Sequence, residues 1–246
     1  MEQKPTNRFA VERGAREDLL HGRRVAFFGG SFDPPHIGHL AVARAARELL
    51  RLDEVLFVPV GRQPLKIGLG AAYEDRCAMT RIAIEGEPEF SVSMIDAPHA
   101  EDAPNYTAET LEALQGMMSK GGKLFCLMGA DSLLALDHWH RGAEIPFLAE
   151  VIVASRPGEA LEPLGEHLPM GLKLAVEEPE KLENGRLERW KIVDQGGRAA
   201  LLNILPGLHN EVSATELRTA IQTGRGSEQL MPHAVLAYIH NHGIYT

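Results

Sequence analysis

Residues 24–39 read RVAFFGGSFDPPHIGH. The apolar run that ends at Phe28 predicts a buried strand, and the two glycines after it predict a turn. Asp33 is expected to cap a helix, and the two prolines that follow fit a first helical turn, where a missing N–H does no harm. The stretch therefore predicts a strand, a tight turn and a helix that continues to about Leu50.

The two histidines of this stretch, His36 and His39, are three residues apart, so we expect them on one face of the helix. A pair of solvated surface histidines is the ordinary alternative, and a metal site is disfavoured because no third ligand stands at a helpful spacing. The stretch contains neither GxGxxG nor GxxxxGK[ST], so the usual dinucleotide fold and the P-loop are not supported. Glycines at the end of a strand, followed by free helical N–H groups, favour an anion site.

The rest of the chain alternates between the two kinds of element. Predicted strands cover residues 54–60, 90–95, 123–128, 150–155 and 199–205. Predicted helices cover residues 74–85, 108–118, 131–139, 213–222 and 227–242. This alternation predicts βαβ units, and hence a Rossmann-like α/β fold with an open parallel sheet flanked by helices.

The domain organisation follows from the regions that break this alternation. Residues 158–198 fit it least, because they are rich in Glu, Gly and Pro and hold only a weak strand candidate at 189–193. We expect a single domain over 23–246, with a peripheral excursion at about 158–198. Residues 1–22 are expected to form a flexible N-terminal extension.

The composition restricts the class of protein. The 246 residues carry a formal net charge of −9 without any Lys/Arg block, which argues against broad nucleic-acid binding. No apolar stretch approaches the roughly 18 to 20 residues of a membrane span. The first 22 residues do not resemble a signal peptide, so a cytoplasmic location is expected. Cys77 and Cys126 stand alone, so no disulfide framework is predicted.

The string Gly-Ser-Phe-Asp-Pro-x-His-x-Gly-His resembles the signature of the nucleotidyltransferase superfamily with the HxGH motif. Further stretches are similar to the bacterial nicotinate-nucleotide adenylyltransferase family over about residues 23–245, much of 158–198 excepted: Pro59 to Lys66, Asn105 to Leu111, Gly129 to Asp131 with Trp139, Ser155 to Gly158, Val212 to Arg218, and Tyr238-Ile239 with Gly243 to Tyr245. One departure is Leu65, where the family usually has a histidine.

The resemblance implies transfer of the adenylyl group of ATP to nicotinate mononucleotide, which gives nicotinate adenine dinucleotide and pyrophosphate. It implies a catalytic set of His36, His39, Lys66 and Arg218. It implies ATP contacts from Gly29, Gly30, Ser31, Phe32, Gly129, Asp131, Arg156, Ser213 and Thr215. Tyr106, Thr107 and Trp139 would contact nicotinate mononucleotide. Mg²⁺ would arrive with ATP and not in a site of the protein's own, and a homo-oligomer is left open.

Several of these residues have a plainer interpretation. Ser213 begins an S-x-x-E capping box, and Asp131 could cap its own helix. Lys66 alone would be a surface lysine, and Trp139 alone half-buried packing. The histidines on either side of Trp139, and the pair at 240 and 242, are expected to be structural or surface residues.

Two competing functions remain. One is an adenylyltransferase that acts on nicotinamide mononucleotide or another phosphorylated acceptor. The other is a catalytically silent nucleotide-binding protein, against which the intact histidines, Lys66 and Arg218 weigh.

Overall fold

The computed structural model describes residues 22–64, 70–99, 103–155, 164–208, 213–224 and 229–246. Lys66 and Arg156 therefore lie outside the described residues, as do Leu65 and nearly all of the expected N-terminal extension.

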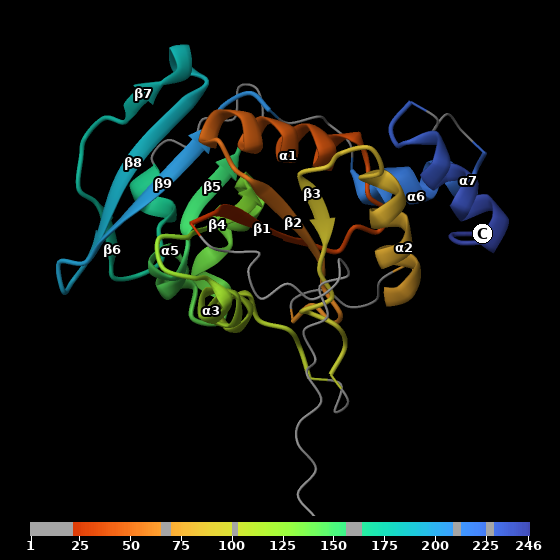
Figure 1. Ribbon diagram of the computed structural model, residues 1–246, viewed down its shortest axis with the longest axis horizontal. Coiled ribbons are helices and arrows are strands. Elements are labelled where there is room, and N and C mark those ends of the chain that lie inside the picture. Colours follow the sequence, from red (N-terminus) through yellow and green to blue (C-terminus); the bar gives the residue numbers. More distant parts are fainter. Residues whose placement is uncertain (1–21, 65–69, 100–102, 156–163, 209–212, 225–228) are drawn as a thin grey trace, which may run out of the picture.

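Within these ranges, nine strands form one sheet in the order β3-β2-β1-β4-β5-β9-β8-β6, with β7 paired to β8 (Figure 1). The strands are β1 Arg24–Gly30, β2 Glu54–Pro59, β3 Phe90–Val92, β4 Lys123–Gly129, β5 Glu150–Ala154, β6 Leu172–Leu174, β7 Glu180–Leu182, β8 Leu187–Asp194 and β9 Ala199–Leu205. Strands β3, β2, β1, β4, β5 and β9, which follow one another across the sheet, pair in parallel, and this confirms the predicted Rossmann-like sheet. The pairings of β8 with β9, β6 and β7 are antiparallel, so the complete sheet is mixed.

Helices cover both faces of the sheet and one of its ends. They are α1 Ile37–Leu50, α2 Tyr73–Ala83, α3 Thr107–Met117, α4 Ala130–Leu134, α5 Ile145–Leu148, α6 Ala214–Gln222 and α7 His233–His242. Short 3₁₀ turns, η1 to η4, lie at Leu136–His138, Gly142–Glu144, Leu164–His167 and Glu183–Gly185. In Figure 1, α1 lies on one side of the sheet and α3 and α5 on the other, with α2, α6 and α7 beyond the β3 edge.

The side chains of strand β1 divide between two apolar clusters, one on each face of the sheet. Successive side chains of a strand point to opposite faces. Val25 and Phe27 accordingly join the cluster packed by α3, α4 and α5, whereas Ala26 and Phe28 join the cluster packed by α1. The four side chains are buried, and β1 is paired on both edges, so its carboxyl end is held rigidly.

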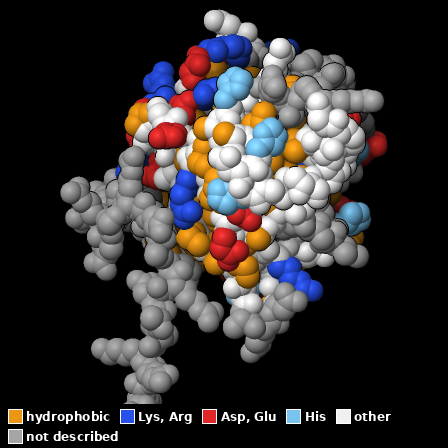
Figure 2. Space-filling model, turned by 90° about the vertical axis from the view of Figure 1, so that its right-hand side faces the viewer, with side chains coloured by type: hydrophobic (Ala, Val, Ile, Leu, Met, Phe, Trp, Pro, Cys, Tyr) orange, Lys and Arg blue, Asp and Glu red, His pale blue; other side chains and the backbone are white. Residues whose placement is uncertain are grey.

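A third apolar cluster joins α2, α6 and α7. Met79, Leu217, Val235 and Ile239 are buried there. The face at this end of the molecule carries basic, acidic and histidine side chains beside one another (Figure 2). In the part of the chain that the structure describes, no helix combines the length and the apolar character needed to cross a membrane.

Two predicted helix starts, and the alternative account of Asp131 as a helix cap, were wrong. Helix α1 is capped by His36 and not by Asp33, because the Asp33 carboxylate accepts hydrogen bonds from another segment. Helix α4 is capped by Gly129, so Asp131 lies in its first turn. Helix α7 begins at His233, after Pro232, later than the predicted 227.

The excursion at 158–198 also differs from expectation. Its weak strand candidate, 189–193, is the middle of the eight-residue strand β8, which continues the sheet beyond β9. The strand is mixed in character because only Leu187 and Ile192 are fully buried, and this weakens the apolar pattern in the sequence.

Candidate active site

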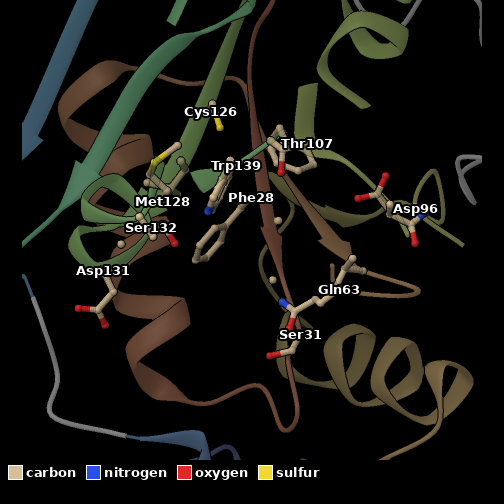
Figure 3. A pocket seen from close by; sticks show the side chains of 18 of the residues that line it. Phe28, Ser31, Gln63, Asp96, Thr107, Cys126, Met128, Asp131, Ser132 and Trp139 are labelled. Carbon is tan, nitrogen blue, oxygen red and sulfur yellow. The ribbon is translucent and has the colours of Figure 1, made fainter. Parts of the chain in front are cut away.

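A pocket of about 790 Å³ opens at the carboxyl ends of β1 and β4. These strands are neighbours in the sheet, although β2 and β3 extend from β1 in the other direction, so the pocket lies at the topological switch point. The predicted site residues that line it are Gly29, Gly30, Ser31, His36, His39, Tyr106, Thr107, Gly129, Asp131 and Trp139. The structure thus brings together residues that are up to 110 positions apart in the chain. Figure 3 shows the side chains of Ser31, Thr107, Asp131 and Trp139 around it.

The histidine pair lies at the start of α1. The two ring centroids are 3.7 Å apart, and His36 is the N-cap residue, whereas His39 is in the first turn. The His36 backbone N–H donates to His39 Nδ1 at 3.2 Å. Phe32 and Phe28 pack against the His39 ring, with centroids 5.0 and 6.1 Å away. The orientation of His39 is therefore fixed by a backbone hydrogen bond on one side and by aromatic packing on the other.

These surroundings decide the protonation of His39. Burial, and secondly the neighbouring His36, hold the pKa of His39 well below its ordinary value of 6.5. The ring is therefore neutral at physiological pH and carries one proton. Because Nδ1 accepts the His36 N–H, that proton must lie on Nε2. His39 is consequently a neutral donor with a defined tautomer.

The N-termini of two long helices reach the pocket, in addition to that of the short helix α4. Helix α1 begins there at its cap, His36, and α3 begins there with Tyr106 as the cap and Thr107 as its first residue. The first N–H groups of a helix have no partner within the helix, and the helix dipole adds partial positive charge. Both ends therefore suit anionic groups of a ligand.

The aromatic wall of the pocket is larger than the sequence indicated. Trp139 is partly buried and packs on the core of α3 and α4, while Tyr106 lies against His140 with centroids 4.4 Å apart. His138 and His140 both line the pocket. The interpretation of these two histidines as surface or structural residues missed this, although their position next to Trp139 was a usable signal.

Asp33 connects the motif to three distant segments. Its carboxylate accepts the N–H of Gly70 at 2.7 Å, the N–H of Ala71 at 3.0 Å and the hydroxyl of Tyr245 at 2.7 Å. Its backbone carbonyl accepts Arg218 Nη1 at 2.8 Å. The side chain of Asp33 is 2% exposed, so this is an internal support and not a ligand contact.

Arg218 of α6 contacts the motif at Asp33, but Arg218, Ser213 and Thr215 are not part of the pocket lining. Arg218 Nη2 donates to the Thr215 hydroxyl at 3.2 Å, and Arg218 Nη1 is 3.6 Å from Asp33 Oδ2. The Ser213 hydroxyl accepts the Glu216 N–H at 3.4 Å, which confirms the predicted N-cap. The structure therefore places a partly exposed cation beside Asp33 of the histidine-containing motif.

Phe32 is likewise displaced from the pocket, since it is 1% exposed and packs edge-on against Phe28. The glycines of the turn also have a packing reason. A Cβ on Gly29 would lie 2.5 Å from the Phe27 ring, and one on Gly30 would lie 3.1 Å from the Phe32 ring.

Arg76 was missed by the sequence analysis. It is 1% exposed, and its guanidinium donates to the carbonyl of Ser31 at 2.7 Å and to that of Val60 at 2.8 Å. These carbonyls follow the ends of β1 and β2, so a buried cation joins the two strand ends beneath the pocket. Burial lowers the pKa of Arg76, and the Asp33 carboxylate opposes this effect. In the sequence, Arg76 looks like an ordinary helix residue.

Asp96 and Asn105 shape the far end of the pocket. Burial raises the pKa of Asp96 to about 6, although its carboxylate accepts the Thr110 hydroxyl at 2.5 Å. Asn105 accepts the Arg62 N–H at 2.9 Å, and its own N–H donates to the Arg62 carbonyl at 3.0 Å. The loop after β2 is therefore held to the segment before α3.

Proteins similar to this chain include nucleotidyltransferases of known family. The sequence profile of the cytidylyltransferase-like family matches residues 27–220. A protein of Roseiflexus sp. (strain RS-1) named probable nicotinate-nucleotide adenylyltransferase is 38% identical, with 90% of this chain and 97% of that protein aligned. A protein of the same name from Pseudomonas entomophila (strain L48) is 34% identical, with 91% and 95% aligned.

Solved structures show the same fold. The nicotinic acid mononucleotide adenylyltransferase of Plasmodium falciparum, solved in complex with NaAD, aligns with a TM-score of 0.65 at 14% identity, covering 91% of this chain and 97% of that one. A putative nicotinate-nucleotide adenylyltransferase of Vibrio parahaemolyticus aligns with a TM-score of 0.56 at 18% identity, covering 91% and 95%.

Proposed function

The chain belongs to the nicotinate-nucleotide adenylyltransferase family, within the cytidylyltransferase-like proteins, and from this premise we infer how its own residues carry the reaction. The enzyme transfers the adenylyl group of ATP to nicotinate mononucleotide and so takes part in NAD biosynthesis. The observation that supports this best is the shared pocket of His39, two helix N-termini and Trp139.

The reaction needs little from the protein in the way of proton transfer. An oxygen of the mononucleotide phosphate attacks the α-phosphorus of ATP, and the bond from that phosphorus to the bridging oxygen of the β-phosphate breaks. Pyrophosphate leaves with the electron pair. Because the attacking phosphate is already ionised at neutral pH, positioning and stabilisation of charge supply most of the catalysis.

His39 is proposed to donate its Nε2–H to an oxygen of the α-phosphate. The lowered pKa and the acceptor role of Nδ1 support a neutral donor and not an imidazolium. Such a donor, fixed before the substrate arrives, needs no reorganisation as charge develops. His36 is proposed to contact the triphosphate from the same turn, together with Gly29, Gly30, Ser31 and the Phe32 backbone.

Arg218 is proposed to stabilise charge on the leaving pyrophosphate. Two of its nitrogens bond to the Asp33 carbonyl and the Thr215 hydroxyl, which hold the guanidinium beside the motif. Ser213 and Thr215 belong to the same helix start. Lys66, for the phosphates, and Arg156, for the adenine, remain proposals from the family resemblance.

The two ends of the pocket are proposed to receive different rings. Gly129 and Asp131, at the end of β4, would contact the ATP ribose. Trp139 would stack on the pyridine ring, and the backbone N–H groups at Tyr106 and Thr107 would bind its carboxylate. The arrival of the N-terminus of α3 beside Trp139 supports a negatively charged substituent there.

Enzymes of this family use ATP, generally with a divalent metal ion. We propose Mg²⁺, brought in on the triphosphate. Among the described residues, no group of three or more His, Cys, Asp or Glu side chains could hold a metal ion. Phosphate oxygens and water would then supply most of the ligands of Mg²⁺.

Pyrophosphate release from Mg-ATP, measured with nicotinate and with nicotinamide mononucleotide, tests the function. We expect strong preference for the nicotinate substrate. Preference for nicotinamide would move the assignment to the other acceptor, and silence with both, despite ATP binding, would indicate a silent nucleotide-binding protein. We further propose a cytoplasmic enzyme without nucleic acid as partner; retention of nucleic acid during purification at moderate salt would contradict the latter.

A further inference from the structure

Tyr245 is not part of the pocket lining, yet its hydroxyl is bonded to the catalytic motif. The side chain is 8% exposed, and its hydroxyl donates to Asp33 Oδ1 at 2.7 Å. Asp33 stands three positions before His36. The adenylyl-transfer mechanism above gives Tyr245 no role, so the function of its hydrogen bond to Asp33 is a separate question.

The Asp33 carboxylate also determines where another segment lies. Its two oxygens accept the N–H groups of Gly70 and Ala71, at 2.7 and 3.0 Å. Arg218 contacts the same residue through the backbone carbonyl, at 2.8 Å. Tyr245 therefore orients the one side chain on which the motif, the segment at 70–71 and the α6 cation converge.

The packing around Gly70 shows how closely these parts fit. A Cβ on Gly70 would lie 2.8 Å from Tyr245 Cε1 and 2.9 Å from Arg218 Cδ. The glycine backbone thus sits against both side chains at once. A side chain at position 70 would therefore collide with both Tyr245 and Arg218.

The phenol is suited to a permanent donor role. Burial raises the pKa of Tyr245, and the Asp33 carboxylate raises it further, so the hydroxyl keeps its proton throughout the working range of pH. Tyr245 Oη is then a fixed donor to a buried carboxylate, a kind of hydrogen bond that is stronger than one between neutral groups.

We propose that Tyr245 is a positioning residue for adenylyl transfer. Its hydrogen bond holds the Asp33 side chain in place, and Asp33 in turn keeps the motif with His36 and His39, residues 70–71 and Arg218 in fixed positions relative to one another. This rests on the proposed function. Because Tyr245 is not part of the pocket lining, its loss should leave ground-state binding of both substrates nearly unchanged. The reaction step should suffer, since small misplacements of catalytic groups lower rates strongly.

Tyr245→Phe removes only the hydroxyl and is the test. We expect kcat to fall about tenfold, with KM for Mg-ATP and for nicotinate mononucleotide within about twofold of wild type. Tyr238→Phe is the matched control. This substitution also removes a tyrosine hydroxyl that donates a hydrogen bond to a carboxylate, in this case to Asp75 Oδ1 at 2.9 Å, but among the described residues the Asp75 carboxylate has no link to the motif. Its kcat should equal that of wild type.

A double-mutant cycle with Asp33→Asn separates positioning from general loss of stability. If Tyr245 acts through Asp33, the second substitution adds little to the first, so kcat of the double variant stays near that of Asp33→Asn. Additive losses, an unchanged kcat for Tyr245→Phe, or an equal loss in Tyr238→Phe would each overturn the proposal.

Hydrogen exchange distinguishes this proposal from the proposed function. The amides of Gly70 and Ala71 should exchange faster in Tyr245→Phe than in wild type, whether or not the enzyme turns over. A wild-type protein that is silent with nicotinate mononucleotide defeats the function, and unchanged exchange at these two amides defeats the proposal about Tyr245.

Discussion

At the scale of the residue, His39 combines a fixed tautomer with a neutral charge state. His39→Ala should lower kcat by about 10²- to 10³-fold, because in the proposed mechanism it removes one preorganised donor to the developing charge. Pyrophosphate release gives the rate, and circular dichroism shows whether the fold is retained. His233→Ala, an exposed histidine at the start of α7, is the control. Wild-type turnover in His39→Ala would remove it from the mechanism.

Asp96 makes stability depend on pH. Its pKa is raised from 3.8 to about 6, so the folded protein takes up this proton more readily than the unfolded chain. The stabilisation by protonated Asp96 is fully present below pH 3.8 and is lost as pH rises through about 6. A nearby positive charge on His99 would work against this rise.

Asp96→Asn stays uncharged at every pH and can still accept the Thr110 hydroxyl hydrogen bond. The free energy of unfolding of the variant relative to wild type should therefore be greater near pH 7.5 than near pH 4.5, by about 2 kcal/mol. Urea titrations at the two pH values measure this difference. A difference that is independent of pH would contradict the raised pKa.

The place of a single residue in the site could be predicted only where that residue belongs to a local sequence motif. His36, His39 and the glycines stand within eleven consecutive positions, so their common place in the pocket was foreseeable. Arg76 was missed because only the fold brings the carbonyls of Ser31 and Val60 to it, whereas the position of His138 and His140 next to Trp139 was a local signal that was not used. Assignments to Lys66 and Arg156 stay predictions.

At the scale of the element, the segment after β4 depends on Gly142. A Cβ there would lie 1.8 Å from the Leu136 carbonyl oxygen, so the turn that follows Trp139 admits no side chain. Gly142→Ala should lower the free energy of unfolding by about 2 to 4 kcal/mol, because backbone cannot move aside cheaply. Thermal unfolding measures the loss.

Gly116→Ala is the control for this turn. Gly116 lies in α3, and no atom comes within 4 Å of the added Cβ. Alanine in a helix is favoured over glycine by about 0.5 to 1 kcal/mol, so this variant should be slightly more stable than wild type. A Gly142→Ala protein as stable as Gly116→Ala would contradict the close approach of the Leu136 carbonyl.

The element types followed well from sequence, and the starts of helices less well. Buried strands such as β4, with five consecutive buried residues, produce apolar runs that are easy to recognise. Asp33 looked like a cap because local sequence favours that role. Its carboxylate instead bonds Gly70, Ala71 and Tyr245, contacts that no local pattern contains.

At the scale of the whole molecule, the antiparallel extension is the feature that sequence indicated least. Strand β8 lies between β9 and the short strands β6 and β7, with Glu188, Arg189 and Lys191 among its residues. Such a strand, in which most side chains are only partly buried, carries neither a continuous apolar run nor a strict alternation, so periodicity was a poor guide.

The proposed single domain over 23–246 predicts one cooperative unfolding transition. The β8–β9 pairing spans six residue pairs, and β9 is paired to β5 in the centre of the sheet, so the extension should unfold with the core. Calorimetry should give equal calorimetric and van't Hoff enthalpies. Two resolved transitions would instead separate the extension as a unit of its own.

The hydrogen bond between Tyr245 and Asp33 has a consequence for the time course of folding. It joins residues 212 positions apart, and Arg218 meets Asp33 across 185. Contacts of such separation close long loops and form late, whereas neighbouring strands and helices can pair early. After dilution from denaturant, the far-ultraviolet signal should recover first and turnover last. The return of activity would then report when the last long-range contacts form, whereas circular dichroism would report only the early formation of helices and strands.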